Sequence, residues 1–488
     1  DRMEPSRVLF IFTVLVCISN ALRAPLDKPN IVVLFADDLG YGDLSCNGHP
    51  TIKTPNLDFL AENGIKLTTW YSGASVCTPS RAALLTGRLP IRSGLADNSH
   101  RVLRCDSEGG LPANETTIAA HLKTVGYKTG MIGKWHLGQR KEYLPPNRGF
   151  DFYYGIPFSV DMGSLTPYEN HQGCTPLPLI QNLDVIEAPT DLTKVAPRYS
   201  EQAVNFIKEN KDDPFFLYMA FSHVHTSIEG HWQWVSEKWA NTSDRGLFGD
   251  ATQELDWVAG NIIQTLINEK LQENTLVFFT SDNGPWMIRY KDGGSEGLFT
   301  GISAGYSDTG KGSTWEGGVR EPGIAWWPGQ IKPNTVSDEI VTSYDIFTTV
   351  LNVAGVPIPT DRIFDGKDMM PVLKGGKSEH EDLFLYRGAT LYAVRHGAYK
   401  AHFITKSGYG KDPAITHNPP LLFNINVDPS EAYPLNASQY KDVIAAINTA
   451  VEAHKKSLIK GKDQMTLANI EYAVCCSKAN KCTCLSDS

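Results

Sequence analysis

The sequence predicts an α/β fold with a large, mainly parallel sheet, followed by a smaller antiparallel sheet with a helix. From Asn30 to about Val356, short apolar runs alternate with amphipathic stretches, as is typical of α/β domains. After residue 355 the pattern changes to segments of alternating polarity separated by Gly/Pro turns, which indicates antiparallel strands. A length of 488 residues with 41% apolar and 20% charged content suits a globular protein with one large core and a smaller unit.

The elements of the large sheet follow from apolar runs and helical periods. A short, continuous apolar run is typical of a strand that is buried on both faces. Such runs predict strands at residues 31–36, 127–132, 215–221 and 275–280. Residues 116–125 and 249–268 have the period of a helix.

The C-terminal part is predicted to form a separate α+β unit. Its strands are expected at residues 383–387, 390–395, 399–404 and 421–424, and a helix at 432–458. We place the boundary near residue 380. The prediction is therefore a catalytic α/β domain over residues 25–380 and a small subdomain with a disulfide-rich tail over residues 381–488.

The first residues have the layout of a secretory signal peptide. Arg2 and Arg7 precede the apolar run 8–18, and small residues follow it. We expect a signal over residues 1–21, with cleavage after Ala21 or Ala24. The alternative is a membrane anchor, but the run is shorter than the roughly 20 residues of a spanning helix, and no later segment reaches that length. We therefore expect a chain of the secretory pathway, lysosomal or secreted, without a transmembrane anchor.

In the secretory pathway, sequons can be glycosylated and cysteines can form disulfides. Asn114, Asn241 and Asn436 each begin an Asn-x-Ser/Thr glycosylation sequon. Disulfides are expected in the same compartment.

Four cysteines fall within ten residues of the tail: Cys475, Cys476, Cys482 and Cys484. They predict two disulfides that hold the C-terminus. A zinc site is the alternative, but the adjacent Cys475-Cys476 pair lacks the usual spacing. Cys105 and Cys174 are candidates for a further disulfide. Apart from Cys77, the cysteines Cys46, Cys105 and Cys174 remain. Since this number is odd, at least one thiol is expected to be free.

The charge balance excludes one class of partner. The net charge is −9, the pI is near 5.8, and no block of Lys and Arg occurs. Nucleic acid is therefore not expected to bind.

Polar groups follow four of the predicted strands. These groups are Asp37-Asp38, Gly133–His136, Ser222–His225 and Ser281–Gly284. In open α/β sheets ligands bind outside the carboxyl ends of the strands, so the four groups are expected to meet at one site.

Acidic side chains at two of these strand ends predict a metal site. Asp37, Asp38, Asp282 and Asn283 offer only oxygen ligands, which suit Ca²⁺ or Mg²⁺ rather than zinc. The alternative is that both pairs are turn formers. Their occurrence together at strand ends, in a chain that also contains the Cys77 segment, favours the metal site.

The same region supplies cationic side chains: Arg81, Lys134, His136, His225 and Lys311. A dianionic tetrahedral ester needs positive charge near its oxygens and an acid for the leaving oxygen. His223, two residues from His225, is not included among the candidates.

The segment Cys77-Thr78-Pro79-Ser80-Arg81 is predicted to open a helix that continues through Ala82–Leu85. Exposed N–H groups at such a helix start attract anions. By itself Cys77 could be a thiolate nucleophile of lowered pKa, or a buried or bridged cysteine.

Three segments together resemble the sulfatase family. Cys77–Arg81 resembles the signal for oxidation of cysteine to formylglycine, and residues 126–136 and 311–322 resemble two further family signatures. The likeness runs from Pro29 to Cys484. It implies an alkaline-phosphatase-like fold, in which helices sandwich a large mixed sheet and a small C-terminal sheet follows.

The resemblance also implies a nucleophile and a metal. A formylglycine-generating enzyme would convert Cys77 during biosynthesis, and the hydrate would attack sulfur. Asp282 would accept the proton of the attacking hydroxyl. The family implies a metal ion, Ca²⁺ in preference to Mg²⁺, on Asp37, Asp38, residue 77, Asp282 and Asn283.

The remaining roles that the resemblance implies concern the ester and the hydrate. His225 and Lys311 would bind the ester and assist departure of the alcohol, and His136 would accept a proton from the second hydroxyl. Arg81 and Lys134 would orient the hydrate. Ser159 matches a serine that binds sulfate.

The leading hypothesis is therefore hydrolysis of sulfate esters of arylsulfatase type. A phosphomonoesterase with an unmodified residue 77 is one alternative, but such enzymes normally use Ser or Thr and zinc. A silent binding protein on the same scaffold is the other. The sequence leaves open whether the substrate is a sulfated small molecule, lipid or carbohydrate, and whether the chain forms a homo-oligomer.

Overall fold

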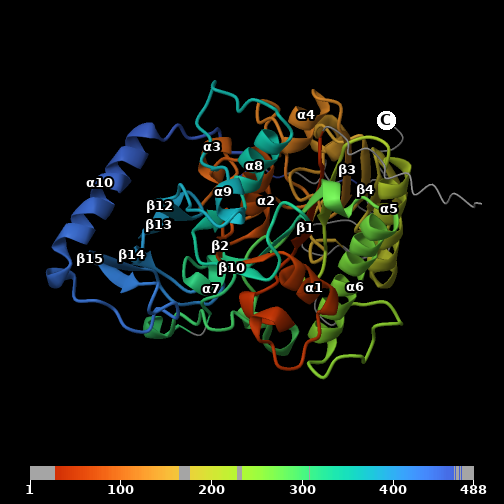
Figure 1. Cartoon of the computed structure of the whole chain (residues 1–488). Helices are drawn as coiled ribbons and strands as arrows, with labels where there is room; N and C mark the ends of the chain where they lie inside the picture. The colour runs from red at the N-terminus through yellow and green to blue at the C-terminus, as the bar shows by residue number, and fades with distance from the viewer. Residues whose placement is uncertain are drawn as a thin grey trace, which may run out of the picture.

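The structure is a computed structural model that describes residues 28–163, 176–227, 233–306 and 308–466, together with Ala468, Tyr472 and Val474. The predicted signal peptide, Cys174 and the four tail cysteines lie outside these residues. Figure 1 shows a large α/β body with a smaller unit beside it. Within the described ranges, no helix is both long and apolar enough to cross a membrane.

A sheet of eleven strands forms the centre of the large body. Its order is β10-β2-β9-β8-β1-β7-β3-β4-β5-β6, and β11 also pairs with β2. Five neighbouring strands are parallel: β8 (Thr275–Ser281), β1 (Asn30–Ala36), β7 (Phe215–Ala220), β3 (Lys128–Gly133) and β4 (Phe152–Gly155). Every residue of β1, β7 and β8 is buried, which explains their continuous apolar sequences.

The outer strands make the sheet mixed. β9 (Arg320–Trp326) runs antiparallel to both β8 and β2 (Ile65–Tyr71). The remaining strands are β5 (Leu179–Gln181), β6 (Asp184–Glu187), β10 (Thr335–Ser337) and β11 (Val341–Thr342).

Helices cover both faces of this sheet. On one face Phe215 of β7 packs on Phe206 of α5 (Val195–Glu209), and α5 packs in turn on α6 (Leu247–Asn268). On the other face Tyr218 packs on Phe35, and the guanidinium of Arg81 from α2 (Cys77–Thr86) lies over the Phe35 ring. Phe215 and Tyr218 are an odd number of residues apart, so their side chains point to opposite faces.

Further helices complete the two layers. α1 (Pro55–Asn63) contacts α6, whereas α4 (Ile118–Lys123) and α8 (Asp345–Val353) contact α2. The other helices are short: α3 (Pro90–Ser93), α7 (Glu316–Val319) and α9 (Met370–Leu373). Segments of 3₁₀ helix lie at Tyr41–Asp43, Ser45–Asn47, Lys141–Tyr143, Pro145–Arg148, Leu192–Lys194, Gln272–Asn274, Met287–Asp292, Ile302–Ala304 and Ala437–Gln439.

The smaller unit is an antiparallel sheet covered by one helix. Its strands are β12 (Asp382–Arg387), β13 (Thr390–His396), β14 (Tyr399–Thr405) and β15 (Ile415–Asn424), in that order. Helix α10 (Lys441–Ser457) packs Ile447 and Val451 on Val394, Ala401 and Leu422. The division of the chain near residue 380 stays a prediction, and β12 begins at Asp382.

The predicted fold class is confirmed, and the bounds of several elements differ from prediction. Helix α10 begins at Lys441 rather than Ala432, because Leu435 pairs with Leu422 of β15 and Asn436 caps a separate 3₁₀ turn. Strand β15 begins at Ile415 and includes two prolines, which an edge strand tolerates. Helix α2 begins at Cys77, as predicted, and Pro79 is its third residue.

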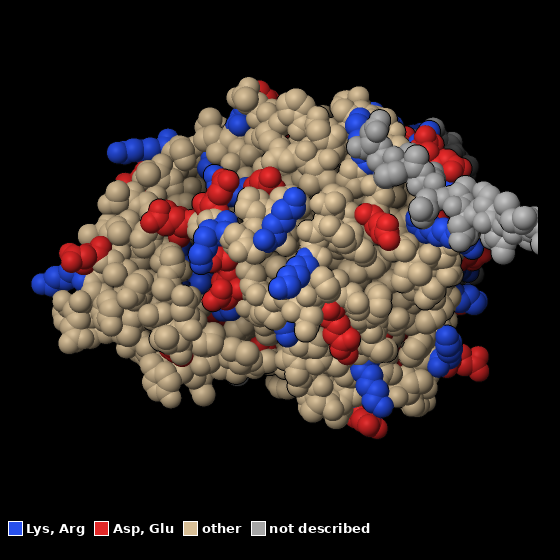
Figure 2. Space-filling model, in the orientation of Figure 1, with Lys and Arg blue, Asp and Glu red and all other residues tan. Residues whose placement is uncertain are grey.

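Charges of both signs are interspersed on the face drawn in Figure 2. A mixed surface of this kind does not provide an extended field of one sign on that face.

His454 of α10 links the helix to the small sheet. Its ring stacks on Phe384 at 3.9 Å between centroids, and its Nε2 forms a hydrogen bond of 2.9 Å with the hydroxyl of Tyr386. Burial, with a further contribution from the charge of Arg92, lowers the pKa of His454 to about 4.

We therefore expect His454 to make stability dependent on pH. The unfolded chain binds this proton below about pH 6.5, whereas the folded chain binds it only near pH 4, so stability is complete above pH 6.5 and falls as the pH drops. The loss is up to about 3 kcal/mol. Thermal unfolding of H454Q between pH 7 and 4 should show a flatter decline than wild type, and H100N should keep the wild-type decline. Equal slopes for H454Q and wild type would contradict this account.

Candidate active site

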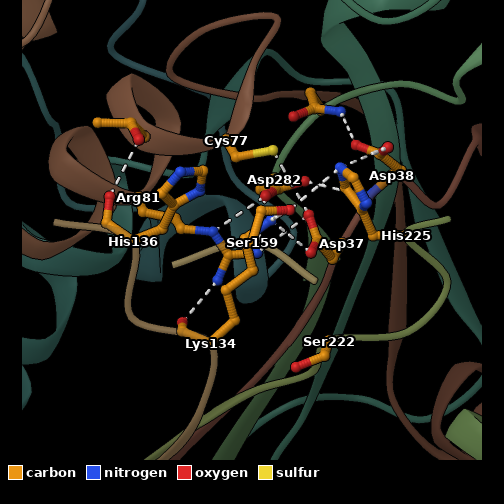
Figure 3. Close-up of polar contacts among 12 residues, drawn as sticks. Asp37, Asp38, Cys77, Arg81, Lys134, His136, Ser159, Ser222, His225 and Asp282 are labelled. Carbon is orange, nitrogen blue, oxygen red and sulfur yellow. Dashed lines mark hydrogen bonds and ion pairs between the residues drawn. The ribbon is translucent and has the colours of Figure 1, made fainter. Parts of the chain in front are cut away.

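The carboxyl ends of four parallel strands meet at one edge of the large sheet. β8, β1, β7 and β3 are consecutive neighbours, so the residues that follow them lie side by side. Figure 3 shows the predicted side chains gathered there: Asp37, Asp38, Cys77, Arg81, Lys134, His136, Ser159, His225 and Asp282. Lys311 and Asn283 join the same cluster through hydrogen bonds to Asp38. Every predicted catalytic, binding and metal residue is thus in one place.

Cys77 is the first residue of α2, and its side chain is buried with 2% exposed. The thiol is free and donates to Asp37 Oδ1 at 3.5 Å. Burial raises the pKa of Cys77 well above its ordinary value, although Lys134 and Lys311 oppose the shift. Because the thiolate is the nucleophilic form, an unmodified Cys77 would be a poor nucleophile here.

Asp37 is held ionised by two cations. Lys134 Nζ donates to Oδ2 at 2.6 Å, and Arg81 Nη2 lies 3.3 Å from Oδ1. Burial opposes ionisation, but the charges of Lys134 and Arg81 hold the pKa of Asp37 well below its ordinary value. Asp37 therefore offers anionic oxygens to the site.

Asp282 is bound by Arg81 through two donors. Nε and Nη2 donate to Oδ2 at 3.1 and 2.7 Å, while Nη1 donates to the carbonyl of Lys134 at 2.9 Å. Burial and the nearby charge of Asp37 nevertheless raise the pKa of Asp282 to about 7. One more positive charge would favour its ionised form.

Asp38 lies in the left-handed region, with φ of 60°, and this turns its carboxylate toward Lys311. Lys311 Nζ donates to Oδ2 at 2.7 Å, and Asn283 Nδ2 donates to Oδ1 at 2.8 Å. Burial opposes the charge on Lys311, but Asp38 and its neighbours hold the pKa of this lysine well above its ordinary value.

His225 presents an unprotonated nitrogen to the site. Its Nδ1 donates to the carbonyl of Thr226 at 2.7 Å, so Nε2 accepts from Lys311 Nζ at 3.0 Å. Burial and the charge of Lys311 lower the pKa of His225. Ser159 Oγ lies between Lys134 Nζ at 3.2 Å and His225 Nε2 at 3.4 Å.

His136 has the opposite tautomer. Its Nε2 donates to the carbonyl of Leu103 at 2.8 Å, and within the described ranges its buried Nδ1 has no partner. Burial and the charge of Lys134 lower the pKa of His136 well below its ordinary value. His136 is therefore a neutral base with a free lone pair.

The donor set fits a hard cation. Ligand atoms of Asp37, Asp38, Cys77 and His225 all lie within 4.8 Å of one another. Asn283 binds Asp38 through Nδ2, and its Oδ1 is buried with no hydrogen-bond partner among the described residues, which leaves an orphaned oxygen on this side chain. Oxygen donors favour Ca²⁺ or Mg²⁺. His225 is a weaker candidate ligand, because Lys311 already donates to its Nε2.

Two residues near the site were not predicted. The Trp286 ring lies 5.3 Å from that of His225, and Lys311 Nζ lies 4.5 Å from its centre. Burial opposes ionisation of Asp161, but His225 and Lys311 hold its pKa below the ordinary value. The only signals in the sequence are that Trp286 directly follows Asp282–Pro285 and that Asp161 is two residues after Ser159.

The remaining predictions concern glycosylation and disulfides. Asn114, Asn241 and Asn436 are all exposed. Cys105 is disulfide-bonded and Cys46 is free, whereas Cys174 and the tail cysteines lie outside the described ranges. The pairing of Cys105 with Cys174 therefore stays a prediction. His223 Nε2 forms a hydrogen bond of 3.2 Å with Glu254 Oε2 of α6.

The cluster combines carboxylates that suit a hard cation with neutral histidines that can act as bases. Together with the fold, it defines a hydrolase for esters of an anionic tetrahedral group. A family model described as Sulfatase matches residues 29–356, and one described as the C-terminal region of aryl-sulfatase matches residues 378–484. The chain belongs to the sulfatase family, whose members hydrolyse sulfate esters. The predicted family is confirmed.

Individual relatives agree with this assignment. The chain is 40% identical over 503 residues to an arylsulfatase of Hemicentrotus pulcherrimus, covering 96% of this chain and 88% of that protein. It is 44% identical over 441 residues to arylsulfatase A of Homo sapiens, covering 83% of each. Among solved structures, the PsFucS1 sulfatase from Pseudoalteromonas sp. matches with a TM-score of 0.77 and 30% identity, over 91% of this chain and 92% of that one.

The ion pairs of Arg81 predict a large loss of stability on truncation. R81A would leave Asp282 and Asp37 buried beside fewer cations, and breaking such a pair costs about 3–5 kcal/mol. The free energies of unfolding of R81A, D282N and the double variant, measured by chemical denaturation, test this prediction. We expect the double variant to be clearly more stable than the sum of the single losses implies. Strictly additive losses of unfolding free energy would show that Arg81 does not offset the cost of burying the Asp282 charge.

Proposed function

We propose that the chain hydrolyses sulfate esters through a formylglycine formed from Cys77, with Ca²⁺ bound beside it. The observation that carries the proposal is the placement of Cys77. A free, buried thiol of raised pKa stands at the start of α2, in hydrogen-bond contact with a carboxylate and surrounded by cations. A protonated thiol in this position is a poor nucleophile, whereas the hydrate of an oxidised side chain would supply a hydroxyl for attack on sulfur.

The oxygen ligands define where the cation would lie. Asp37, Asp38, Asp282, Asn283 and the modified residue 77 would hold it, and the orphaned Oδ1 of Asn283 supports this set. Ca²⁺ is preferred to Mg²⁺ because it accepts more ligands in a less regular arrangement. When bound, it would add positive charge next to the sulfate oxygens.

The side chains around residue 77 would carry out the proton transfers. A formylglycine hydrate supplies two hydroxyls, one for attack on sulfur and one whose ionisation releases sulfate. Asp282 would accept a proton from the first, and the free Nδ1 of His136 would accept a proton from the second. Arg81 and Lys134 would orient the hydrate.

The ester oxygens would be bound on the other side of the cluster. Lys311 Nζ, His225 Nε2 and Ser159 Oγ lie within hydrogen-bond distance of one another or of Lys134. Lys311 and His225 would bind the ester and assist departure of the alcohol, with the ammonium of Lys311 as the proton donor of the pair, and Ser159 would bind a sulfate oxygen. The substrate would be a sulfated small molecule, lipid or carbohydrate.

The biosynthetic setting follows from the same proposal. A formylglycine-generating enzyme would act on the segment Cys77–Arg81. The three exposed sequon asparagines support passage through the secretory pathway, with glycosylation at Asn114, Asn241 and Asn436. The final location would be lysosomal or secreted, with the tail cysteines forming disulfides.

Parallel assays with an aryl sulfate and the matching aryl phosphate test the function. We expect turnover of the sulfate and much slower turnover of the phosphate. H136Q should lower kcat about 10²–10⁴-fold with little change in KM, since it removes a base and keeps the fold. C77A should be inactive. Faster turnover of the phosphate would favour a phosphomonoesterase, and activity on neither would favour a silent scaffold.

Metal removal gives a test that is independent of turnover. After treatment with a chelator, added Ca²⁺ should raise Tm, because binding at 100 times Kd stabilises the folded state by about 2.7 kcal/mol. N283A should show a much smaller shift, since it loses the orphaned oxygen, whereas D442N on the exposed start of α10 should respond like wild type. Identical shifts in N283A and wild type would remove Asn283 from the ligand set.

A further inference from the structure

Two arginines from distant segments converge beside the reaction centre. Arg101 Nη2 donates to the carbonyl oxygen of Gly312 at 2.8 Å, and Arg387 Nε donates to the same oxygen at 2.9 Å. Gly312 directly follows Lys311, so two guanidinium groups lie side by side next to that lysine. Gly312 has φ of 83°, and a Cβ there would lie 2.7 Å from Arg101 Nη1, so the arrangement requires glycine.

No carboxylate among the described residues forms an ion pair with either arginine. Arg387 Nη2 donates to the carbonyls of Ser407 and Gly408 at 3.3 and 2.9 Å. The guanidinium of Arg101 lies 4.4 Å from the centre of the Tyr409 ring. All of these partners are neutral, so the positive charges remain available to an anion.

Other charged groups lie near the pair: Lys406, Asp308 and, beside Asp308, Asp412. Lys406 directly precedes Ser407, whose carbonyl accepts from Arg387 Nη2, so it lies next to this arginine. The charge of Arg387, with burial and Arg101, lowers the pKa of Lys406, in agreement with that position. Lys406 has no hydrogen bond or ion pair within the described ranges. Asp308 lies within the field of Arg101, but its Oδ2 accepts from the backbone N–H groups of Tyr409 and Gly410.

Aromatic rings connect this cluster to the residues that would bind the ester. The Tyr409 ring lies 5.4 Å from that of Trp286, which in turn lies 5.3 Å from the His225 ring. On the other side, Arg101 lines a small pocket with Ser75 and Val76, which directly precede Cys77. The cations therefore border the side of the site where the ester would bind.

We propose that Arg101, Arg387 and Lys406 form an anion subsite, and that the substrate has a second anionic group next to the ester that is cleaved. The inference rests on the proposed function and names its substrate class. That class is a sugar sulfate with a further sulfate or carboxylate, rather than a lipid or aryl ester of single charge. Guanidinium groups suit both anions, because their paired N–H donors match two oxygens.

Two sugar substrates of different charge test the subsite. One is a monosulfated hexosamine, and the other is a disaccharide of the same sulfated hexosamine with a uronate. For K406Q and R101Q, kcat/KM on the disaccharide should fall about 10-fold each, as expected for a hydrogen bond or contact to a charged group. On the monosulfated sugar it should change less than about twofold, because the charge of the second group is absent. R101K should restore part of the loss.

Controls separate a subsite from a general charge effect. Lys53 is exposed and has no ion pair within the described ranges, so K53Q makes the same charge change elsewhere and should leave both substrates unaffected. Equal losses on both sugars would show long-range attraction of any anion and would overturn the subsite. No loss on either would overturn it as well.

Binding in the inactive C77A background distinguishes failure of the subsite from failure of the proposed function. Calorimetry with the disaccharide should show that K406Q weakens binding about 10-fold in this background. If the chain turns over neither sugar but binding depends on Lys406, the subsite stands and the proposed function fails. If turnover occurs and binding is independent of Lys406, the subsite fails alone.

Discussion

The site depends on a balance of buried charge. Three carboxylates, Asp37, Asp38 and Asp282, meet at the ends of two neighbouring strands, and each is bound by a lysine or arginine: Lys134, Lys311 and Arg81. An isolated charge in such an interior costs several kcal/mol, so the acids require these cations whenever no metal is bound. The cations come from the loop after β3, from α2 and from the loop before α7, and their ion pairs fix these segments against the sheet. A divalent cation among the acids would free lysine donors for the sulfate.

The same cations set the protonation of the two histidines. His136 and His225 are buried beside Lys134 and Lys311, and both have a lowered pKa, so both are neutral at ordinary pH. Each ring donates one N–H to a backbone carbonyl, but from opposite nitrogens, which leaves Nδ1 of His136 and Nε2 of His225 as acceptors. Two bases of fixed tautomer therefore stand on different sides of residue 77. Because the two histidines lie on different sides of residue 77, they suit a reaction with separate proton transfers at the leaving oxygen and at the nucleophile.

The sequence alone predicts the parallel strands and the residues at their ends, because β1, β7 and β8 are buried on both faces and consist of apolar runs. It does not predict β9, since Arg320, Glu321 and Pro322 interrupt the pattern within that strand. The meeting of Arg101 with Arg387 is equally absent from any local pattern, because only the folded chain joins segments so far apart. Helix α10 begins later than the sequence pattern predicts for a related reason: Leu435 lies in the segment with a helical period but pairs with Leu422 of β15. Local periodicity thus locates the strand ends, and long-range contacts decide what surrounds them.

Mass spectrometry of the tryptic peptide Leu67–Arg81 tests the central claim most directly. The protein should be produced in a eukaryotic secretory host whose own sulfatases are modified. The account predicts an aldehyde at residue 77, observed directly or as its hydrate. An unmodified thiol at Cys77 in that host would contradict it, because the buried, protonated side chain would then have no nucleophile to offer.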